Sequence, residues 1–247
     1  QHYVWAGGHF VLLLAATRYL LAWLTFKSAT YGLYYKASYI GALVSYAIVC
    51  YKSLGTPQAN AGFAKRAAMD ENVQYFLLAL FWFFSKPLAI SLIPFAIFSL
   101  FHALTFLRSN VLPHFFPPTP PAAAGQPAQQ NPMLKKVQVW IKSNYDPAMR
   151  VVAYAELVIL VRVIVGALIR KNSLLSPLIY AHFLRQRYYH SIFTRNAIAH
   201  VSALITNQAQ KSGNPTVIRV WENAQVLIGR WGGSTLAPQQ PAATGAA

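Results

Sequence analysis

The chain has 247 residues, of which 55% are hydrophobic and 11% are charged, whereas soluble domains usually carry about 25% charged residues. Five acidic residues are outnumbered by 21 basic ones, which gives a net charge of +16. This composition excludes an ordinary soluble domain and predicts an anionic partner, either lipid headgroups or nucleic acid.

Two long apolar segments come first in the chain. Residues 4–26 contain a single charge, Arg18, and residues 31–51 contain a single charge, Lys36. A spanning helix needs roughly 20 apolar residues, so each segment is long enough to cross a bilayer. Because only four residues separate them, the two must run antiparallel and form a helical hairpin. Residues 4–26 are too long for the core of a signal peptide.

A polar loop is predicted over residues 52–72, with Asp70 as the N-cap of the helix that follows. The next apolar stretch, residues 73–107, is too long for one straight span and is interrupted at Lys86-Pro87. Two interpretations stay open: a short interfacial helix followed by a span, or a re-entrant hairpin that turns at this break.

The middle of the chain changes composition several times. Residues 117–132 hold six prolines and no charge, which predicts a semi-extended, disordered linker. Residues 133–145 combine lysines with apolar residues at helical spacing and predict a short helix on the membrane surface. Residues 151–169 are about one span long. Residues 173–189 are too short in apolar length to cross and then mix cations with tyrosines, so we expect them to lie in the interface.

The clearest amphipathic pattern follows a break at residues 213–215 and covers residues 216–231. Its apolar residues recur at helical spacing on one face, with polar residues mostly on the other. We expect this helix to bind the membrane, while packing on the protein's own membrane domain or on a partner protein stays open. The predicted membrane-binding residues are Val217, Val220, Trp221, Ala224, Leu227, Ile228 and Trp231 on the apolar face, together with Arg219 and Arg230.

Glu156 and Arg162 lie within an apolar segment, and ionisable residues inside a span are functional candidates. They are six positions apart and do not pair well on one helix face, where a spacing of about three or four is needed. We therefore predict structural ion pairing with other helices. The cations available to Glu156 are Arg18, Lys36 and Lys86. The alternative is a transporter or channel regulator that uses Glu156 and Arg162.

The sequence holds no catalytic or metal-binding constellation. None of the seven histidines has a partner at i, i+4 spacing, and the one cysteine, Cys50, lies apart from them. We therefore expect no enzymatic activity, no metal and no cofactor, with a lipid-modifying enzyme as the weaker alternative. The cations are spread from Arg18 to Arg230 beside apolar segments, which indicates lipid headgroups rather than nucleic acid.

The cations also bear on topology. Eight lie after residue 169 and three lie in residues 52–72, and the positive-inside rule places both regions, including the C-terminus, in the cytosol. Five more lie in residues 108–150. Four spans would place these five in the lumen, against the rule. A re-entrant hairpin over 73–107 would keep them cytosolic, but residues 151–169 could then not cross either. Both topologies stay open.

Two blocks resemble the transmembrane protein 33 family, which includes fungal pore-membrane proteins. In the first, an acidic pair precedes a Tyr-Leu-Leu type run, a proline follows a short polar break, and a Phe-Ser-Leu-x-His-Ala run ends the span. These are Asp70-Glu71, Tyr75 to Leu78, Pro87, and Phe98 to Ala103. The second block is Ser173 to Tyr189. The resemblance covers most of residues 1–231. It implies a non-enzymatic protein of the endoplasmic reticulum membrane and nuclear envelope, associated with reticulon-type proteins and with nuclear pore distribution.

The predicted fold class is an all-α integral membrane protein with several transmembrane or re-entrant helices and a C-terminal interfacial amphipathic helix. Hairpins and interfacial helices in one leaflet act as wedges, so the predicted function is to shape or sense membrane curvature. A bilayer with anionic headgroups is the expected partner, and a homo-oligomer is compatible with the sequence. The predicted regions are membrane helices over 1–107, a linker over 108–132, surface, membrane and interfacial segments over 133–190, cytosolic amphipathic helices over 191–231, and a disordered tail over 232–247.

Overall fold

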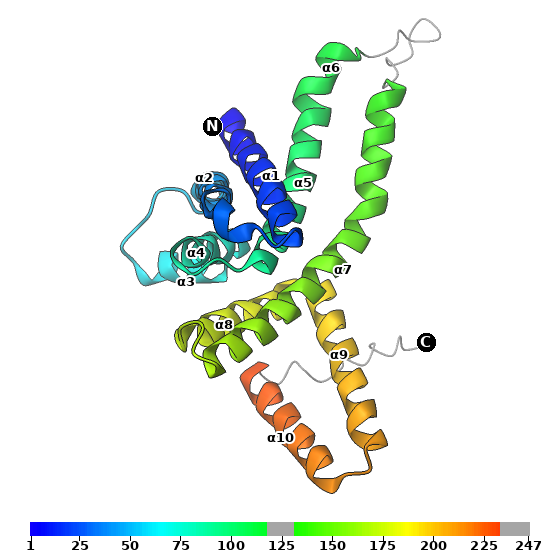
Figure 1. Ribbon diagram of the computed structural model, residues 1–247. Helices are drawn as coiled ribbons and strands as arrows, with labels where there is room; N and C mark the ends of the chain where they lie inside the picture. Colours follow the sequence, from blue (N-terminus) through cyan, green and yellow to red (C-terminus); the bar gives the residue numbers. More distant parts are fainter. Residues whose placement is uncertain (118–130, 233–247) are drawn as a thin grey trace, which may run out of the picture. The chain divides into compact units, whose positions relative to one another are not determined.

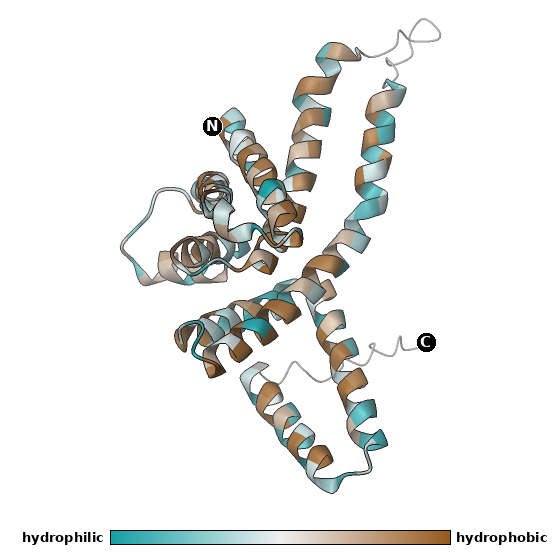
Figure 2. Cartoon of the chain, in the orientation of Figure 1, coloured by the Kyte–Doolittle hydropathy of each residue, from teal (hydrophilic) through white to brown (hydrophobic). Residues whose placement is uncertain are grey.

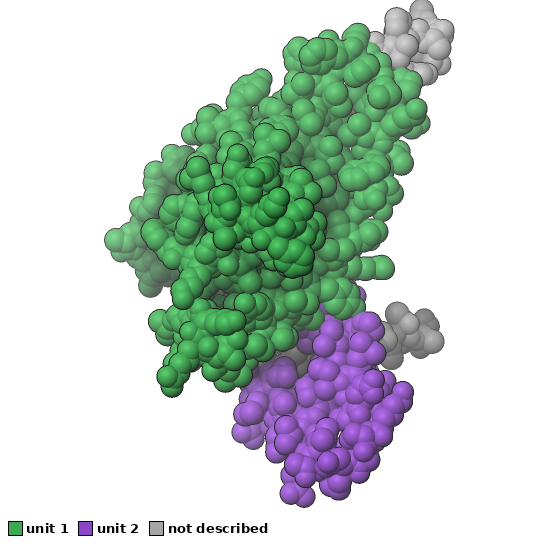
Figure 3. Space-filling view, in the orientation of Figure 1, with its two compact units in different colours: residues 1–183 green, residues 184–247 purple. Residues whose placement is uncertain are grey.

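The computed structural model describes residues 1–117 and 131–232, and these are almost entirely helical (Figure 1). They belong to two compact units, residues 1–183 and residues 184–247, which Figure 3 colours separately. Of the predicted linker over 108–132, residues 118–130 lie outside the described residues, but residues 108–115 are helical and correct the prediction there. The predicted tail lies outside the described residues from residue 233 on. The helices are α1 (His2–Leu24), α2 (Gly32–Leu54), α3 (Ala61–Met69), α4 (Glu71–Phe84), α5 (Leu92–Phe106), α6 (Leu112–Phe115), α7 (Pro132–Leu168), α8 (Leu175–His190), α9 (Ile192–Lys211) and α10 (Pro215–Gly232), with short helical turns at Ser28–Tyr31, Ala89–Ser91 and Leu107–Val111.

In the first unit, α1 and α2 form the predicted hairpin. Their backbones touch at two glycines, because a Cβ atom on Gly41 would lie 2.5 Å from the carbonyl oxygen of Gly8, and one on Gly8 would lie 2.3 Å from Ser45 Oγ. The Ser45 hydroxyl in turn donates a hydrogen bond of 2.9 Å to the carbonyl of Trp5. Small residues at this contact therefore allow the close approach that holds two apolar helices together in lipid.

The region between α2 and α4 corrects one prediction. Residues 52–72 were expected to form a polar loop, and the structure places α3 within them. Asn60 begins this helix by accepting a hydrogen bond of 2.7 Å from the backbone amide of Phe63, which is the ordinary capping role of asparagine. Asp70 is the N-cap of α4, as predicted, and its carboxylate accepts hydrogen bonds from two backbone amides of the first turn.

Within residues 1–117 and 131–232, four helical segments are long and apolar enough to cross a membrane, and the predicted all-α integral membrane fold is confirmed. With its 14 residues, α4 is only about 21 Å long, which is less than the roughly 30 Å of a bilayer core. The stretch 73–107 thus consists of two separate helices, as both interpretations of the sequence require. The four segments are His2–Leu24, Ser28–Leu54, Ala89–Phe115 and Pro132–Leu168.

α7 is one continuous helix of 37 residues, where the sequence predicts a surface helix over 133–145 and a separate span over 151–169. Its length is about 55 Å. Pro147 lies inside it, although an internal proline usually disfavours a helix by about 3 kcal/mol. The helix packs against α5 on the N-terminal side of Pro147. The rings of Trp140 and Tyr145 lie 6.4 and 5.4 Å from the ring of Phe101 on α5. Figure 2 shows the polar residues of α7 concentrated in its N-terminal half.

The core of the first unit is rich in tyrosine. Tyr35, Tyr39 and Phe95 are fully buried between α2 and α5. The two tyrosine hydroxyls share the hydroxyl of Ser91, at 3.2 Å from Tyr35 and 2.6 Å from Tyr39. Buried polar atoms need such partners. Many large apolar side chains point outward instead, Leu33 among them, as expected for helices that contact lipid rather than water.

The second unit contains a helical hairpin of α9 and α10. The chain turns at Gly213, whose φ of +59° lies in the left-handed region that glycine adopts readily. The side chain of Asn214 then accepts a hydrogen bond of 2.9 Å from the amide of Thr216, and Pro215 occupies the first position of α10, where proline is favoured. The break that the sequence predicts at 213–215 is therefore present.

Candidate functional site

The amphipathic helix α10 keeps most of its predicted apolar face open. Val220, Leu227 and Trp231 are 62%, 64% and 52% exposed, and Val217 and Ile228 are also exposed. Trp221 and Ala224 are half-buried. The cations Arg219 and Arg230 are exposed and lie outside the apolar stripe by helical spacing. The structure thus brings the predicted apolar residues together along one side of a single helix.

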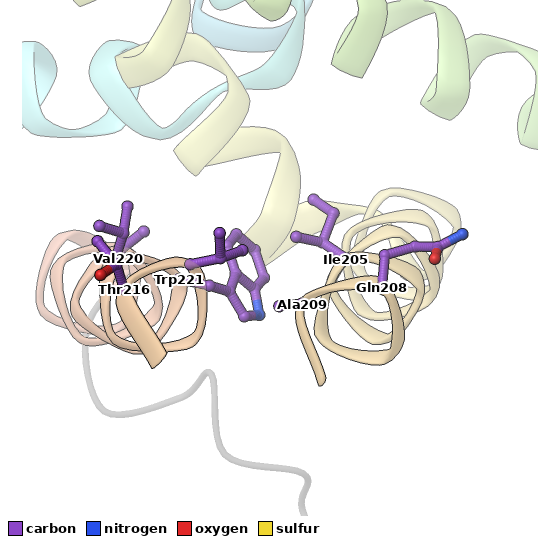
Figure 4. A pocket seen from close by; sticks show the side chains of 8 residues that line it. Ile205, Gln208, Ala209, Thr216, Val220 and Trp221 are labelled. Carbon is purple, nitrogen blue, oxygen red and sulfur yellow. The ribbon is translucent and has the colours of Figure 1, made fainter. Parts of the chain in front are cut away.

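α9 holds one part of this face. The indole nitrogen of Trp221 donates a hydrogen bond of 2.8 Å to Thr206 Oγ1, and the side-chain amide of Gln225 donates to the same oxygen at 3.3 Å. Figure 4 shows Trp221 directed from α10 toward α9, where Ile205 and Ala209 lie. Trp221 therefore anchors α10 to α9, while the more exposed residues of the face stay accessible.

A shallow apolar pocket of about 430 Å³ lies between the two helices. Val217, Val220, Trp221 and Ala224 line it from α10, and the side chains of α9 supply the facing wall: Ile205, Gln208 and Ala209. The α9 residues were not predicted as part of the site. Their signal in the sequence is weak, because α9 mixes small, polar and apolar residues, and only the i, i+4 pair of Ile205 and Ala209 marks the facing side.

Glu156 lies in the tightly packed centre of the first unit. Its side chain is 0% exposed and accepts a hydrogen bond of 2.7 Å from the hydroxyl of Tyr75 on α4. The ring of Tyr75 packs edge-on against Phe95 and Phe183 at 5.6 and 5.1 Å. The space between these side chains has no room for a water molecule. The arrangement couples α4 to α7 through a buried polar contact.

The three cations named as available to Glu156 contact other groups. Arg18 lies 3.7 Å from the centre of the Tyr31 ring, which is a cation–π contact. Lys36 donates to the carbonyl of Phe83 at the end of α4, where a cation is favoured by the helix dipole. Lys86 donates to the carbonyl of Lys171 at 3.4 Å. Ion pairing of Glu156 and Arg162 stays a prediction, and Arg162 is exposed on α7.

Comparison with known proteins extends over the whole described chain. The family model described as Transmembrane protein 33/Nucleoporin POM33 matches residues 1–231. Tetra-spanning protein 1 of Schizosaccharomyces pombe is 35% identical, over 96% of this chain and 86% of its own length. Nucleoporin POM33 of Chaetomium thermophilum is 34% identical, over 90% and 83%. Pore membrane protein of 33 kDa of Saccharomyces cerevisiae is 28% identical, over 80% and 71%. No solved structure matches the chain.

Proposed function

The chain belongs to the transmembrane protein 33/nucleoporin POM33 family, and we propose that it shapes or senses membrane curvature in the endoplasmic reticulum and nuclear envelope. Two relatives carry the names Nucleoporin POM33 and Pore membrane protein of 33 kDa, which supports a place at the curved membrane of nuclear pores. The partners we propose are a bilayer with anionic headgroups, nuclear pore proteins and reticulon-type proteins, and the role is not enzymatic.

The observation that carries this proposal is the open apolar face of α10. Burying one large apolar side chain completely is worth about 1.5–3 kcal/mol, and an interfacial helix buries each only in part. Each cation near an anionic surface adds about 1 kcal/mol. The five exposed apolar residues alone give several kcal/mol. Arg219 and Arg230 point away from this face, and only their long side chains can reach the headgroups. Binding of this strength is reversible and depends on lipid packing, which loosens as a leaflet curves.

The hairpin of α1 and α2 supports the same role from within the bilayer. Its two helices are joined by a short turn at Ser28–Tyr31 and pack at van der Waals distance through Gly8 and Gly41. A compact hairpin of this kind occupies area in the membrane without a large domain on the far side. As two spans the hairpin anchors the chain and adds area to both leaflets, so an excess of area in one leaflet would come from an interfacial α10.

We propose the four-span topology with a cytosolic C-terminus. The name Tetra-spanning protein 1 of a relative agrees with it. The cytosolic side would carry twelve cations, namely Lys52, Lys65, Arg66, Lys86 and the eight after residue 169. The opposite side would carry six, namely Lys27, Arg108, Lys135, Lys136, Lys142 and Arg150. Eight of the twelve cytosolic cations lie within about 20 residues of a span end, where the positive-inside rule applies. The rule therefore favours this orientation by eight cations to six, even though five cations of 108–150 lie on the lumenal side.

A transporter or channel regulator built on Glu156 is the less favoured alternative. A proton or ion relay needs a hydrated or changeable environment around its acid, whereas Glu156 is buried against Tyr75 with no space for water. A structural role for this carboxylate is the better account.

Fluorescence microscopy of the tagged full chain in living cells tests the proposal. The intact protein should be enriched on reticulum tubules and at nuclear pores over flat reticulum sheets. The double variant Val220→Asp/Leu227→Asp should lose this enrichment while remaining in the membrane. Val226→Asp is the matched control, because Val226 is exposed on the opposite side of α10. An even distribution of the intact protein over tubules and sheets would contradict the proposal.

A further inference from the structure

A cavity of about 760 Å³ lies within the first unit, between the α4–α5 break and the turn that links α7 to α8. Its wall holds four cations, Lys86, Arg162, Arg170 and Lys171, and none of its lining residues is acidic. The turn of α7 into α8 supplies hydroxyl and amide groups, among them Ser173. Like charges gathered around one cavity repel each other, and an anion within it would relieve that repulsion.

The turn residues are held in place by specific backbone contacts. α7 ends in a Schellman motif, in which the amide of Lys171 donates to the carbonyl of Gly166 at 2.7 Å. Arg170 occupies the left-handed position of this motif with a φ of +56°. Glycine usually fills that position, because other residues are strained there. The fold thus keeps a guanidinium group at the cavity where local backbone preference favours glycine.

Gly166 leaves room for two further side chains of the cavity. A Cβ atom added to it would lie 1.7 Å from Asn172 Oδ1 and 3.0 Å from Arg162 Nη1. Asn172 in turn donates a hydrogen bond of 3.1 Å to the carbonyl of Val163. Lys86 donates to the carbonyl of Lys171 at 3.4 Å and so links the two loops. The cations are therefore carried by connected segments rather than by independent surface chains.

The other wall of the cavity is apolar. Phe81, Phe84, Leu88 and Val163 contribute to it, and Phe84 is strongly exposed. Arg170 and Lys171 lie just after the end of α7, one of the four described segments long enough to cross a bilayer, and Arg162 lies in its last two turns. A site that combines guanidinium and ammonium groups with an apolar wall at a helix end matches a phospholipid, whose phosphate is charged and whose acyl chains are not.

We propose that this cavity is a binding site for the phosphate-bearing headgroup of an anionic phospholipid. Arg162 and Arg170 bind the phosphate oxygens, Lys86 and Lys171 add charge, and the apolar wall receives the first part of an acyl chain. The site is separate from the face of α10 and does not depend on the function proposed for that helix.

Native mass spectrometry of the purified full chain in detergent tests the proposal. Phosphatidylserine and phosphatidylcholine are titrated in parallel, and the number of bound lipids is read from the mass. The intact protein should bind phosphatidylserine at least about tenfold more tightly than phosphatidylcholine. One cation near an anionic headgroup raises affinity about fivefold, so four cations together can supply more than that ratio. The quadruple variant Lys86→Gln/Arg162→Gln/Arg170→Gln/Lys171→Gln should lose the preference. Equal binding of both lipids by the intact protein would overturn the proposal.

A matched control removes the same charge elsewhere on the described surface. The variant Lys135→Gln/Lys136→Gln/Lys142→Gln/Arg150→Gln changes four exposed cations in the N-terminal half of α7 and should keep the preference. An equal loss in both quadruple variants would overturn the assignment to this cavity.

A second variant excludes misfolding as the cause of a loss. Arg170→Gly removes one cation from the left-handed position that glycine adopts without strain. Its thermal unfolding temperature should be unchanged or higher, and its affinity for phosphatidylserine should fall about fivefold. Unchanged affinity would contradict the proposal.

A third arm distinguishes a lipid from a free phosphate. Inorganic phosphate should not displace phosphatidylserine at equal concentration, because it lacks the acyl chains that the apolar wall binds. Full displacement would overturn the assignment to a lipid.

Discussion

The hydroxyl of Tyr75 donates a hydrogen bond of 2.7 Å to Glu156, which is completely buried, and this contact joins α4 to α7. When the donor is removed, the buried carboxyl oxygen loses this hydrogen bond, and such a loss typically lowers the free energy of unfolding by about 1–3 kcal/mol. We expect Tyr75→Phe to lower the free energy of unfolding by this amount, measured by thermal unfolding in detergent. Tyr51→Phe, at an exposed tyrosine of α2, should have almost no effect, and equal stability of the two variants would contradict the account.

Glu156→Gln separates a structural role from a transport role. Glutamine has the same shape and still accepts the hydrogen bond from Tyr75, so the protein should fold and remain in the membrane. Ion flux through vesicles that contain the variant should equal the flux through vesicles with the intact protein. A changed flux would instead favour the transporter or channel alternative.

The cap of α4 should make stability depend on pH. Burial alone would raise the pKa of Asp70, but hydrogen bonds from the Ser53 hydroxyl and from the amides of Val73 and Asn72 outweigh it and hold the pKa below its ordinary value. A carboxyl whose pKa is lower in the folded state stabilises the fold above its unfolded pKa of about 3.9. That stabilisation is lost as the pH falls through the lower, folded pKa.

Asp70→Ala should therefore lower the free energy of unfolding by about 1 kcal/mol near neutral pH, as expected for a lost N-cap. The difference from the intact protein should shrink below about pH 4. Asp70→Asn keeps a capping oxygen that does not titrate. The stability that this cap gives the variant should therefore not change as the pH falls below about 4. Thermal unfolding as a function of pH measures both, and a deficit of the alanine variant that grows toward low pH would contradict the assignment.

The contact between α1 and α2 should tolerate no added methyl group at Gly41. A Cβ atom there would lie 2.5 Å from the carbonyl oxygen of Gly8 and 2.8 Å from the amide nitrogen of Leu12, and both are backbone atoms. Gly41→Ala should therefore push the helices apart and lower the unfolding free energy by about 1–3 kcal/mol. Gly7→Ala is the control, because nothing lies within 4 Å of its added Cβ. Equal unfolding temperatures for the two variants would be the contrary result.

The four-span topology makes one biochemical prediction. A glycosylation acceptor inserted between residues 117 and 131 should be modified in reticulum membranes, because this segment would be lumenal. The same acceptor inserted at residues 56–59, between α2 and α3, should stay unmodified. The shift in mass on a gel measures the modification. The reverse pattern would invert the topology, and modification at neither site would favour a re-entrant arrangement.

Hydropathy and local chemistry predict much of this fold from sequence. The α1–α2 hairpin follows from two long apolar segments with four residues between them. The cap at Asp70 and the turn at Gly213 follow from residue types at single positions. Tertiary packing accounts for what was missed. The sequence predicts separate segments over 133–145 and 151–169, yet α7 continues through Pro147 between them, beside Phe101 of α5. The α9 side of the candidate site was missed because Thr206 receives its role from Trp221 and Gln225, fifteen and nineteen positions away.

The partners of the cations within the spans also could not be predicted from the sequence. The sequence places Lys36 in a span and indicates an acidic partner, whereas the fold offers it the carbonyls at the end of α4. Such a carbonyl becomes a partner only through the arrangement of α2 against α4, and no local pattern encodes it.

We propose that the exposed face of α10 makes the protein respond to curvature. The most direct measurement reconstitutes the labelled full chain in giant vesicles and pulls narrow membrane tubes from them. The protein density on the tube is then divided by the density on the nearly flat vesicle. This ratio should exceed one for the intact chain and for Val226→Asp, and should fall toward one for Val220→Asp/Leu227→Asp. An unchanged ratio in the double variant would contradict the claim and assign this face to protein packing instead.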